Sequence, residues 1–332
     1  MSRRPVQVGF AGVSAEWLDD ELATLQRQQR MRVSAVFDPT PAVGALGAQR
    51  LGATHCRGFL QLLRSSSVDA LVVANPGWMG WHTVLQAVRL GLPTLFVASR
   101  LDDEAFFDVQ LPDTIRLETA VSYARGTGGG FLMPGLPLRW LPVTIRVREL
   151  TATALGAIEQ LEVDAPGLAL RSRSLAELVD WSLSIVQSAP ASVQVHTTAA
   201  GMEMVLQCRR RRSNGESVSV VLRGLRQHRS GDVAEADVQF EAHGVCRHGD
   251  FQLAAPFQIR HSIGRTAVDE KLNADRSSYD IMLDLFGRRL VGGLVPVPDF
   301  VDLLRARNLV VSAIQSLDHK EPIPVSEEGL GA

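Results

Sequence analysis

The stretch Val6-Gln7-Val8-Gly9-Phe10-Ala11-Gly12 decides the fold, because a short apolar run that ends in glycine predicts a buried strand and a tight turn. Short apolar runs of this kind recur through the first hundred residues, with helical segments between them. The predicted strands cover 6–12, 32–38, 68–74 and 93–97, and the predicted helices cover 15–29, 41–51, 57–65 and 79–90. Apolar strands that alternate with helices indicate a parallel sheet with helices on both faces.

The pattern of predicted elements changes near residue 156, where strand-like stretches follow one another with few helices. The predicted strands cover 157–164, 192–198, 202–211, 216–224, 236–246 and 251–262, and the predicted helices cover 174–188, 278–291 and 299–316. Asn214-Gly215 is typical of a type I′ hairpin between two of these strands. This half therefore predicts an antiparallel sheet with a helical layer. We expect its other face to be apolar and covered by a second copy of the chain.

Length and composition narrow the class of protein. A chain of 332 residues is longer than one hydrophobic core usually serves, and 45% hydrophobic with 21% charged residues is typical of globular domains. A net charge of −2 argues against nucleic-acid binding, and three cysteines are too few for a disulfide framework. With no apolar stretch of ~18 residues and no signal core after Met1, we expect a cytoplasmic protein without a membrane partner.

The turn after the first strand is the place for a dinucleotide phosphate. The fingerprint G-x-G-x-x-G uses its glycines for the turn, for pyrophosphate approach and for helix packing. Gly12 holds the first of these positions, but Ser14 and Trp17 stand at the second and third. The Ser14 hydroxyl could donate to a phosphate, whereas the Trp17 ring should push the helix away and disturb its N-terminal amides. We therefore expect NAD or NADP binding to be weak or lost.

Asp38 ends the second strand, where an acid that accepts the ribose hydroxyls would stand. This placement favours NAD over NADP. We expect NADP to bind no better than NAD, because no arginine immediately follows Asp38. The alternative is that Asp38-Pro39 only ends a strand, as such pairs often do.

Several motifs resemble, in order and spacing, the Gfo/Idh/MocA family, which is named for glucose–fructose oxidoreductase and inositol dehydrogenase. Residues 68–97, with Asn75-Pro76, resemble its third strand, Pro-containing loop, helix and fourth strand. Leu138-Arg139-Trp140-Leu141-Pro142 and Leu155-Gly156-Ala157-Ile158 resemble its Arg-Phe-x-Pro and Leu-Gly-Glu-Ile elements. Further similar segments are 180–193 and 285–325, which include the closing helices and the final Pro-x-x-Val turn.

The resemblance implies an α/β fold, with an N-terminal Rossmann-like parallel sheet followed by an α+β domain that has a mostly antiparallel open sheet. The implied domains are 1–125 and 126–325, with the helices of 278–316 packing back on the first domain and a flexible tail at 326–332. It also implies NAD or NADP as cofactor, with Asn75 and Pro76 among the binding residues, and a sugar or cyclitol as substrate. Homodimers or tetramers through the open sheet are expected as well.

The family's catalytic residues are missing here. Its lysine in Glu-Lys-Pro orients the reacting oxygen, and the histidine of Asp-x-x-x-His shuttles the proton. The first motif is replaced by Val97-Ala98-Ser99, and no lysine precedes Lys271. Arg173 and Glu177 stand at the aspartate and histidine positions, and their i,i+4 spacing favours a surface ion pair.

The weak remaining catalytic candidates are His82, Arg100, Tyr123 and Glu177. His82 is a displaced acid/base or, more simply, an exposed histidine in the first turn of a helix. Arg100 stays charged throughout a cycle and can only polarise an oxygen. Trp78 and Trp81 either cover a cofactor pocket or anchor the helix. We expect no metal site, since His243 and Cys246 would point to opposite faces of a strand.

The sequence thus leaves three functions open. The first is a catalytically degenerate member of this oxidoreductase family that acts as a binding or scaffolding subunit. The second is an active NAD(P)-dependent oxidoreductase on a sugar, cyclitol or related small molecule, with relocated acid/base residues. The third is a ligand sensor with an intact interdomain cleft that takes a small molecule.

Overall fold

A computed structural model describes residues 4–13, 23–97, 101, 103–107, 130–198, 201–210, 217–225 and 239–325. The chain forms two compact units. The first comprises the described residues of Met1–Pro137 and Arg276–Leu304, and the second those of Leu138–Asp275 and Arg305–Ala332. The chain therefore returns to its first unit after most of the second is complete.

The first unit is built on a parallel sheet. Its strands are β1 (Val6–Ala11), β2 (Met31–Phe37), β3 (Thr54–His55), β4 (Ala70–Val73), β5 (Thr94–Phe96) and β6 (Leu132–Pro134). They are arranged in the order β3-β2-β1-β4-β5-β6, and every neighbouring pair is parallel. The order reverses direction at β1, between β2 and β4, as in Rossmann-type folds, and ligands bind such sheets at the carboxyl ends next to this switch point. The predicted parallel sheet is confirmed.

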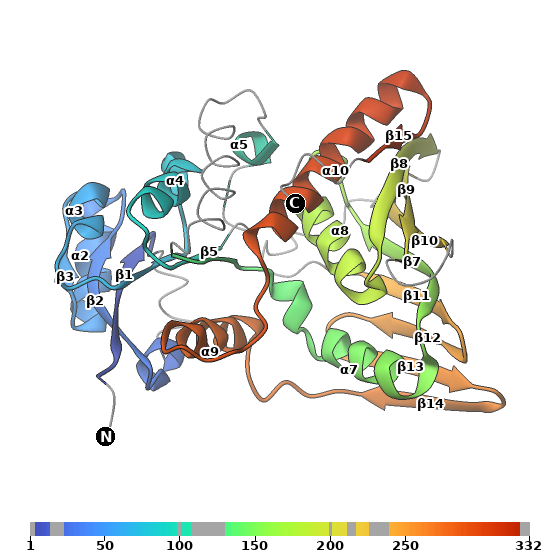
Figure 1. Cartoon of the computed structure of the whole chain (residues 1–332), viewed down its shortest axis with the longest axis horizontal. Helices are drawn as coiled ribbons and strands as arrows, with labels where there is room; N and C mark the ends of the chain where they lie inside the picture. Colours follow the sequence, from blue (N-terminus) through green and yellow to red (C-terminus); the bar gives the residue numbers. More distant parts are fainter. Residues whose placement is uncertain are drawn as a thin grey trace. The chain divides into compact units, whose positions relative to one another are not determined.

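Helices cover both faces of this sheet, as Figure 1 shows for α4 and α9 around β5. The helices are α2 (Pro41–Leu51), α3 (Phe59–Leu63), α4 (His82–Arg89), α5 (Asp103–Phe107) and α9 (Ser278–Leu290), with a 3₁₀ turn η1 (Gly77–Met79) before α4. β1 contacts both layers. A Cβ added to Gly9 would lie 3.2 Å from Leu62 of α3, whereas Val8 and Phe10 border a small cavity together with Leu283 of α9.

Charged groups hold α9 in the first unit. Asp284 pairs with Arg30 at 3.1 Å and with Arg288 at 2.8 Å. Arg276 donates to Asp280 at 2.8 Å, and this hydrogen bond lowers the pKa of Asp280. Both carboxylates are buried, so their charges need these guanidinium groups as partners. Arg30 thus ties this C-terminal segment to the N-terminal part of the chain, whereas Arg276 and Arg288 pair within the segment.

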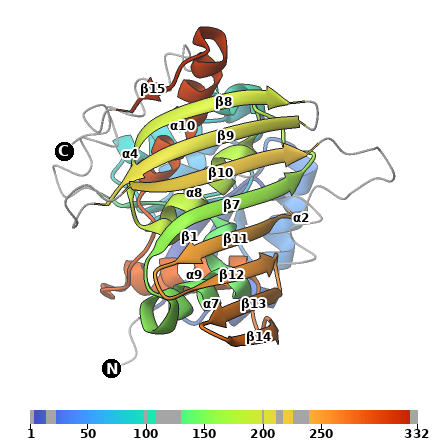
Figure 2. The same ribbon diagram turned by 90° about the vertical axis from the view of Figure 1, so that its right-hand side faces the viewer.

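The second unit is built on a nine-stranded mixed sheet, seen face-on in Figure 2. Its strands are β7 (Ile158–Pro166), β8 (Ala189–Thr198), β9 (Gly201–Arg209), β10 (Ser217–Leu225), β11 (Glu241–Cys246), β12 (Gly249–Ala254), β13 (Gln258–Ile263), β14 (Thr266–Lys271) and β15 (Ile323–Pro324). The order is β14-β13-β12-β11-β7-β10-β9-β8-β15. Among the described strands of this second sheet, only the β7–β10 pairing is parallel. The expected mostly antiparallel sheet is confirmed.

One face of this sheet carries the core of the second unit. The helices are α7 (Pro142–Leu150), the π-helical turn η4 (Thr151–Leu155), α8 (Arg173–Val186) and the part of α10 (Phe300–His319) that follows Leu304. Ser172 caps α8 by accepting from the Leu175 amide at 3.2 Å. In β7 the buried residues Leu161, Val163 and Ala165 alternate with more exposed ones, as a sheet with one covered face requires.

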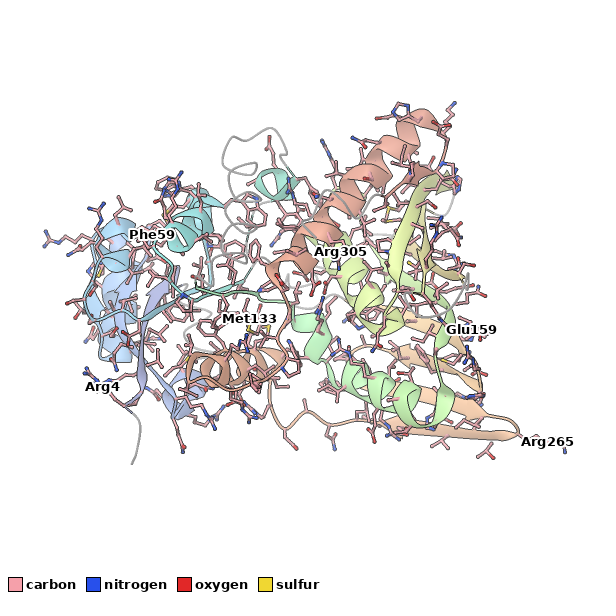
Figure 3. All side chains as sticks on the ribbon, in the orientation of Figure 1. Arg4, Phe59, Met133, Glu159, Arg265 and Arg305 are labelled. Atoms are coloured by element: carbon pink, nitrogen blue, oxygen red, sulfur yellow. The ribbon has the colours of Figure 1, made fainter. Side chains whose placement is uncertain are left out.

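The other face of the sheet is polar, which makes the expectation of an apolar open face wrong. Its central residues include Gln160, Glu162, Asp164, Glu203, Gln207, Ser219, Arg223 and His243. Glu159, labelled in Figure 3, also lies on this outer side and is half exposed. Most apolar residues of these strands are turned toward the helical layer, and Val205, Val221 and Val245 stand among the polar residues of the outer face.

Several predicted elements differ from the structure. The segment 251–262 forms two strands, β12 and β13, joined by a turn rather than one strand. β14 was not predicted, because it lies at the sheet edge and its residues are mostly exposed. β9 and β10 pair as predicted, while the Asn214-Gly215 turn lies outside the described residues. None of the described helices is long and apolar enough to cross a membrane.

Candidate functional site

Three strand ends meet at the turn after β1. The Gly12 amide donates to the Phe37 carbonyl at the end of β2, at 2.9 Å. Gly12 has φ +78°, and a Cβ at this position would lie 1.6 Å from the Asn75 carbonyl oxygen after β4. Only glycine allows this approach. The structure therefore brings together Gly12 and Asn75, two of the predicted cofactor-binding residues.

Asp38 braces the same turn. Its Oδ2 accepts from the Val13 amide at 2.9 Å, and its Oδ1 accepts from the Thr40 amide at 2.7 Å. Each carboxylate oxygen keeps a further lone pair, so a hydroxyl can still donate to it. Asp38 is half-buried. It therefore ends a strand, as the alternative interpretation has it, and also presents a fixed acceptor at the carboxyl end of β2.

Asp38 lies in the wall of a cleft of about 860 Å³ within the first unit. The cleft is built by the segments that follow β2, β3 and β4. Its apolar wall consists of Phe37, Pro39, Pro41, Phe59, Leu60 and Met79, and Figure 3 labels Phe59 at the start of α3. An apolar cleft with a few polar groups is the usual form of a small-molecule site.

The two tryptophans after β4 take different places. Trp78 lines the cleft and is 85% exposed, which leaves one ring face available to a ligand. Trp81 is buried, donates from Nε1 to the Ala105 carbonyl at 3.1 Å, and stacks on Phe96 at 5.4 Å. Trp78 thus covers the pocket, while Trp81 anchors the helix.

Three basic residues complete the cleft. His82 is exposed at the start of α4, as expected, and lines the cleft. His55, which ends β3, and Arg57, two residues further on, line it as well and were not found from the sequence. β3 has two residues only, so no periodic pattern reveals that the chain turns into the site there. Of the described cleft residues, Asp38 is the one carboxylate.

Two residues of α8 lie deeper than the sequence predicts. Glu177 is 8% exposed, so its predicted surface position is wrong, and Arg173 is half-buried. One turn further, Asp180 accepts two hydrogen bonds from Arg139, at 2.8 and 2.6 Å. The neighbouring Trp181 donates to Thr144 Oγ1 at 2.8 Å. This part of the second unit is a hydrogen-bonded interior.

Other predicted site residues lie outside the described residues. They are Ser14, Trp17, Ala98, Ser99, Arg100 and Tyr123. The described residues contain no cluster of His, Cys, Asp and Glu suited to a metal ion. Burial raises the pKa of Cys208 and Cys246 to about 12, so neither thiol is suited to act as a nucleophile near neutral pH.

The structure can be compared with solved proteins. KijD10, a 3-ketoreductase from Actinomadura kijaniata in complex with NADP, has a TM-score of 0.67 at 18% identity, over 94% of this chain and 97% of that one. The dehydrogenase MviM from Clostridium difficile has a TM-score of 0.70 at 11% identity, over 94% and 100%. The UDP-N-acetylglucosamine 3-dehydrogenase GnnA from Acidithiobacillus ferrooxidans has a TM-score of 0.66 at 17% identity, over 94% and 97%.

These structures show that the chain has the two-domain fold of the Gfo/Idh/MocA-type oxidoreductases, as the sequence resemblance implied. No protein-family model matches the sequence, and no curated protein matches it. The residues of the cleft fit the adenosine half of a dinucleotide. Of these residues, Asp38 offers an acceptor to ribose and the exposed Trp78 offers an aromatic ring to adenine, while Gly12, outside the cleft wall, forms the close turn after β1.

Proposed function

We propose that this protein binds the adenosine half of NAD or NADP in the cleft of its first unit and serves as a binding subunit without hydride transfer. The observation that carries the proposal is the cleft itself, in which Asp38 is fixed by two backbone amides beside an apolar wall and the exposed Trp78. A bound dinucleotide would supply hydride chemistry. The KijD10 structure, which has the same fold and contains NADP, supports this use of the fold.

The absent acid/base residues support a degenerate role. The sequence has no lysine before Lys271, and Glu177 stands where the resemblance implies a histidine. Removing a general acid or base typically lowers a rate by about 10²–10⁴-fold. Since both groups are missing, oxidation of a bound sugar or cyclitol is expected to be undetectable.

Calorimetric titration of the full chain with NAD⁺ and NADP⁺ tests the binding. We expect binding that Trp78→Ala weakens about tenfold or more, because stacking of a base on an aromatic ring is worth about 1–3 kcal/mol. Leu294→Ala is the matched control, since Leu294 is also strongly exposed in the first unit but does not line the cleft. Absence of binding, or equal affinity of the Trp78 variant and the wild type, contradicts the proposal.

The second candidate is an active oxidoreductase with relocated acid/base groups. In this alternative the cleft holds the reacting substrate instead of the adenosine half, because His82 is an exposed imidazole in its wall. Turnover of NAD(P)⁺ with any member of a panel of sugars, inositols and their acids would establish it. Single substitutions of His82, Arg100 and Tyr123 would then locate the group that moves the proton.

We further propose that two or four copies assemble through the open sheet of the second unit. The face is polar, so the contact would be made by hydrogen bonds and ion pairs rather than by apolar burial. Light scattering at micromolar concentration tests this, and a monomer of 36.1 kDa contradicts it.

A further inference from the structure

A cluster of ionisable side chains crosses the outer face of the second sheet, on strands β11, β7, β10, β9 and β8, which lie side by side in Figure 2. Arg223 of β10 is its centre and donates to Glu162 at 2.9 Å and to Glu203 at 3.1 Å. Each glutamate faces a histidine on the strand beyond it. His243 of β11 is opposite Glu162 of β7, and His196 of β8 is opposite Glu203 of β9. A histidine therefore stands at either end of the cluster.

The carboxylates of this cluster outnumber its permanent cation. Asp164 adds a third carboxylate, 3.6 Å from Arg223. Among the described residues, no second arginine or lysine pairs with Glu162, Asp164 or Glu203. The hydrogen bond from Arg223, and to a lesser extent the charge of His243, lowers the pKa of Glu162. Three carboxylates around one guanidinium group leave two net negative charges while the histidines are neutral.

The two histidines are the groups that can change this charge near neutral pH, because histidine gains or loses its charge between about pH 5 and 8. On the β12 side, His243 faces Gln252, and the nearest charged residue on that face of β12 is Asp250. Its own strand adds Glu241. On the far side of His196, β15 pairs with β8 three or more positions away and has no charged residue. Both imidazoles thus have mainly carboxylates around them, which favour a protonated ring.

The cluster lies at the middle of the open face, because β7 is the fifth of the nine strands in the order of the sheet. A face-to-face contact between two identical copies is two-fold symmetric, so a patch at its centre meets the same patch of the other copy. Two net negative clusters would then face one another. Like charges repel more strongly there than in water, because the contact excludes solvent.

We propose that assembly through the open sheet depends on pH, so that protonation of His196 and His243 strengthens it and deprotonation weakens it. This inference rests on the proposed function, because it assumes that the open sheet is the contact between copies. With both imidazoles charged, the cluster is neutral, and each imidazolium can pair with a carboxylate of its own copy or of the second copy. A pair of histidines beside carboxylates is a usual way to make an interface sensitive to pH.

Sedimentation velocity of the full chain over a concentration series gives the dissociation constant of the assembly at each pH. We expect this constant to fall about tenfold or more as the pH is lowered from about 8 to about 5.5. Carboxylates ordinarily titrate near pH 4, so they keep their charge over this range. High salt should reduce the pH dependence, because it screens the repulsion between the two clusters.

Two double variants separate the charge of the histidines from their presence. His196→Gln with His243→Gln should keep the dissociation constant near its high-pH value throughout the range. His196→Lys with His243→Lys carries permanent charges and should associate tightly even at about pH 8. His319→Gln is the matched control, because His319 is an exposed histidine that ends α10 on the helical side of the sheet. Its loss should leave the pH dependence unchanged.

The outcomes distinguish this inference from the proposed assembly. A wild-type dissociation constant that is the same at every pH, or that rises as the pH falls, overturns the inference while the assembly stands. A pH dependence that survives in the double glutamine variant also overturns it, because other groups then control the contact. A monomer at every pH overturns both the inference and the assembly, and leaves the proposed nucleotide binding untouched.

Discussion

Two arginines, one in each unit of the chain, have opposite surroundings. In the cleft of the first unit, Arg57 has no partner among the described residues. On the outer face of the second unit, Arg223 lies among three carboxylates, with Glu162 at 2.9 Å, Glu203 at 3.1 Å and Asp164 at 3.6 Å. Compensated charge contributes to structure, whereas an uncompensated charge in a concave wall is available to a ligand.

A third arginine, Arg139, is more buried than Arg57 and Arg223. Arg139 and Asp180 form a bidentate pair in which the carboxylate is 3% and the guanidinium 14% exposed. Arg148 donates to the Arg139 carbonyl, and burial together with the charge of Arg139 lowers its pKa. Asp180 is thus the negative partner between two buried positive groups, and its removal should lower the stability of the second unit.

The largest expected effect comes from Asp180→Ala. It leaves the Arg139 guanidinium buried next to Arg148 without the carboxylate, and loss of one partner of a buried pair costs about 3–5 kcal/mol. Urea unfolding of the full chain measures this loss. Asp164→Ala, on the outer face at 42% exposure, is the control and should change the free energy of unfolding by less than about 1 kcal/mol. If both variants lower the free energy of unfolding equally, the buried pair contributes no more to stability than the exposed one.

The next effect is expected at the turn of the first unit. Gly12→Ala combines a left-handed φ with an overlap against the Asn75 carbonyl, so a loss of about 3 kcal/mol and loss of nucleotide binding are expected. The control is Gly52→Ala, where φ is +62° and nothing lies within 4 Å of the added Cβ. It should cost about 1–2 kcal/mol and leave binding intact. Nucleotide binding by a folded Gly12→Ala protein would show that the turn does not shape the cleft.

The smallest effect is a pH dependence within the second unit. Hydrogen bonds from Arg146, at 2.8 and 2.7 Å, lower the pKa of Glu270 in the folded state. Because the folded pKa is below the unfolded value of about 4.3, the pair stabilises the fold at higher pH, and this contribution is lost as pH falls toward the folded pKa.

The urea midpoints of the wild type and Glu270→Gln should therefore differ at pH 7 and converge as the pH falls below about 4. Asp269→Asn is the control, because Asp269 is 77% exposed and lies 3.8 Å from Arg260, which is 60% exposed. It should show no such convergence. A difference between wild type and Glu270→Gln that is constant over this pH range would contradict the assignment.

Local patterns were sufficient for most elements. The alternation of apolar runs and helical periods predicts the parallel sheet and its helices, and 174–188 closely matches α8 at Arg173–Val186. The same alternation places Gln160, Glu162 and Asp164 of β7 on the polar outer face. Our expectation of an apolar face therefore failed although the period of two was present in the sequence.

Part of the candidate site was also determined by the sequence alone. Gly12, Asp38 and Asn75 stand at strand ends, and parallel strands bring such ends to one edge, so these residues could be predicted to meet. The amide hydrogen bonds that engage both oxygens of Asp38 could not be predicted, because they depend on where the Val13 and Thr40 backbones come to lie.

Only the tertiary structure decided which side chains surround the cleft. It separated Trp78, which is exposed, from Trp81, which is buried, although the two are three residues apart. It placed Arg57 in the same cleft as Asp38, which stands nineteen positions earlier, through a strand too short to leave a periodic signal. Sequence periodicity reports which face of an element is covered, whereas the groups that meet across a cleft depend on the packing of separate elements, and no local pattern encodes that distance.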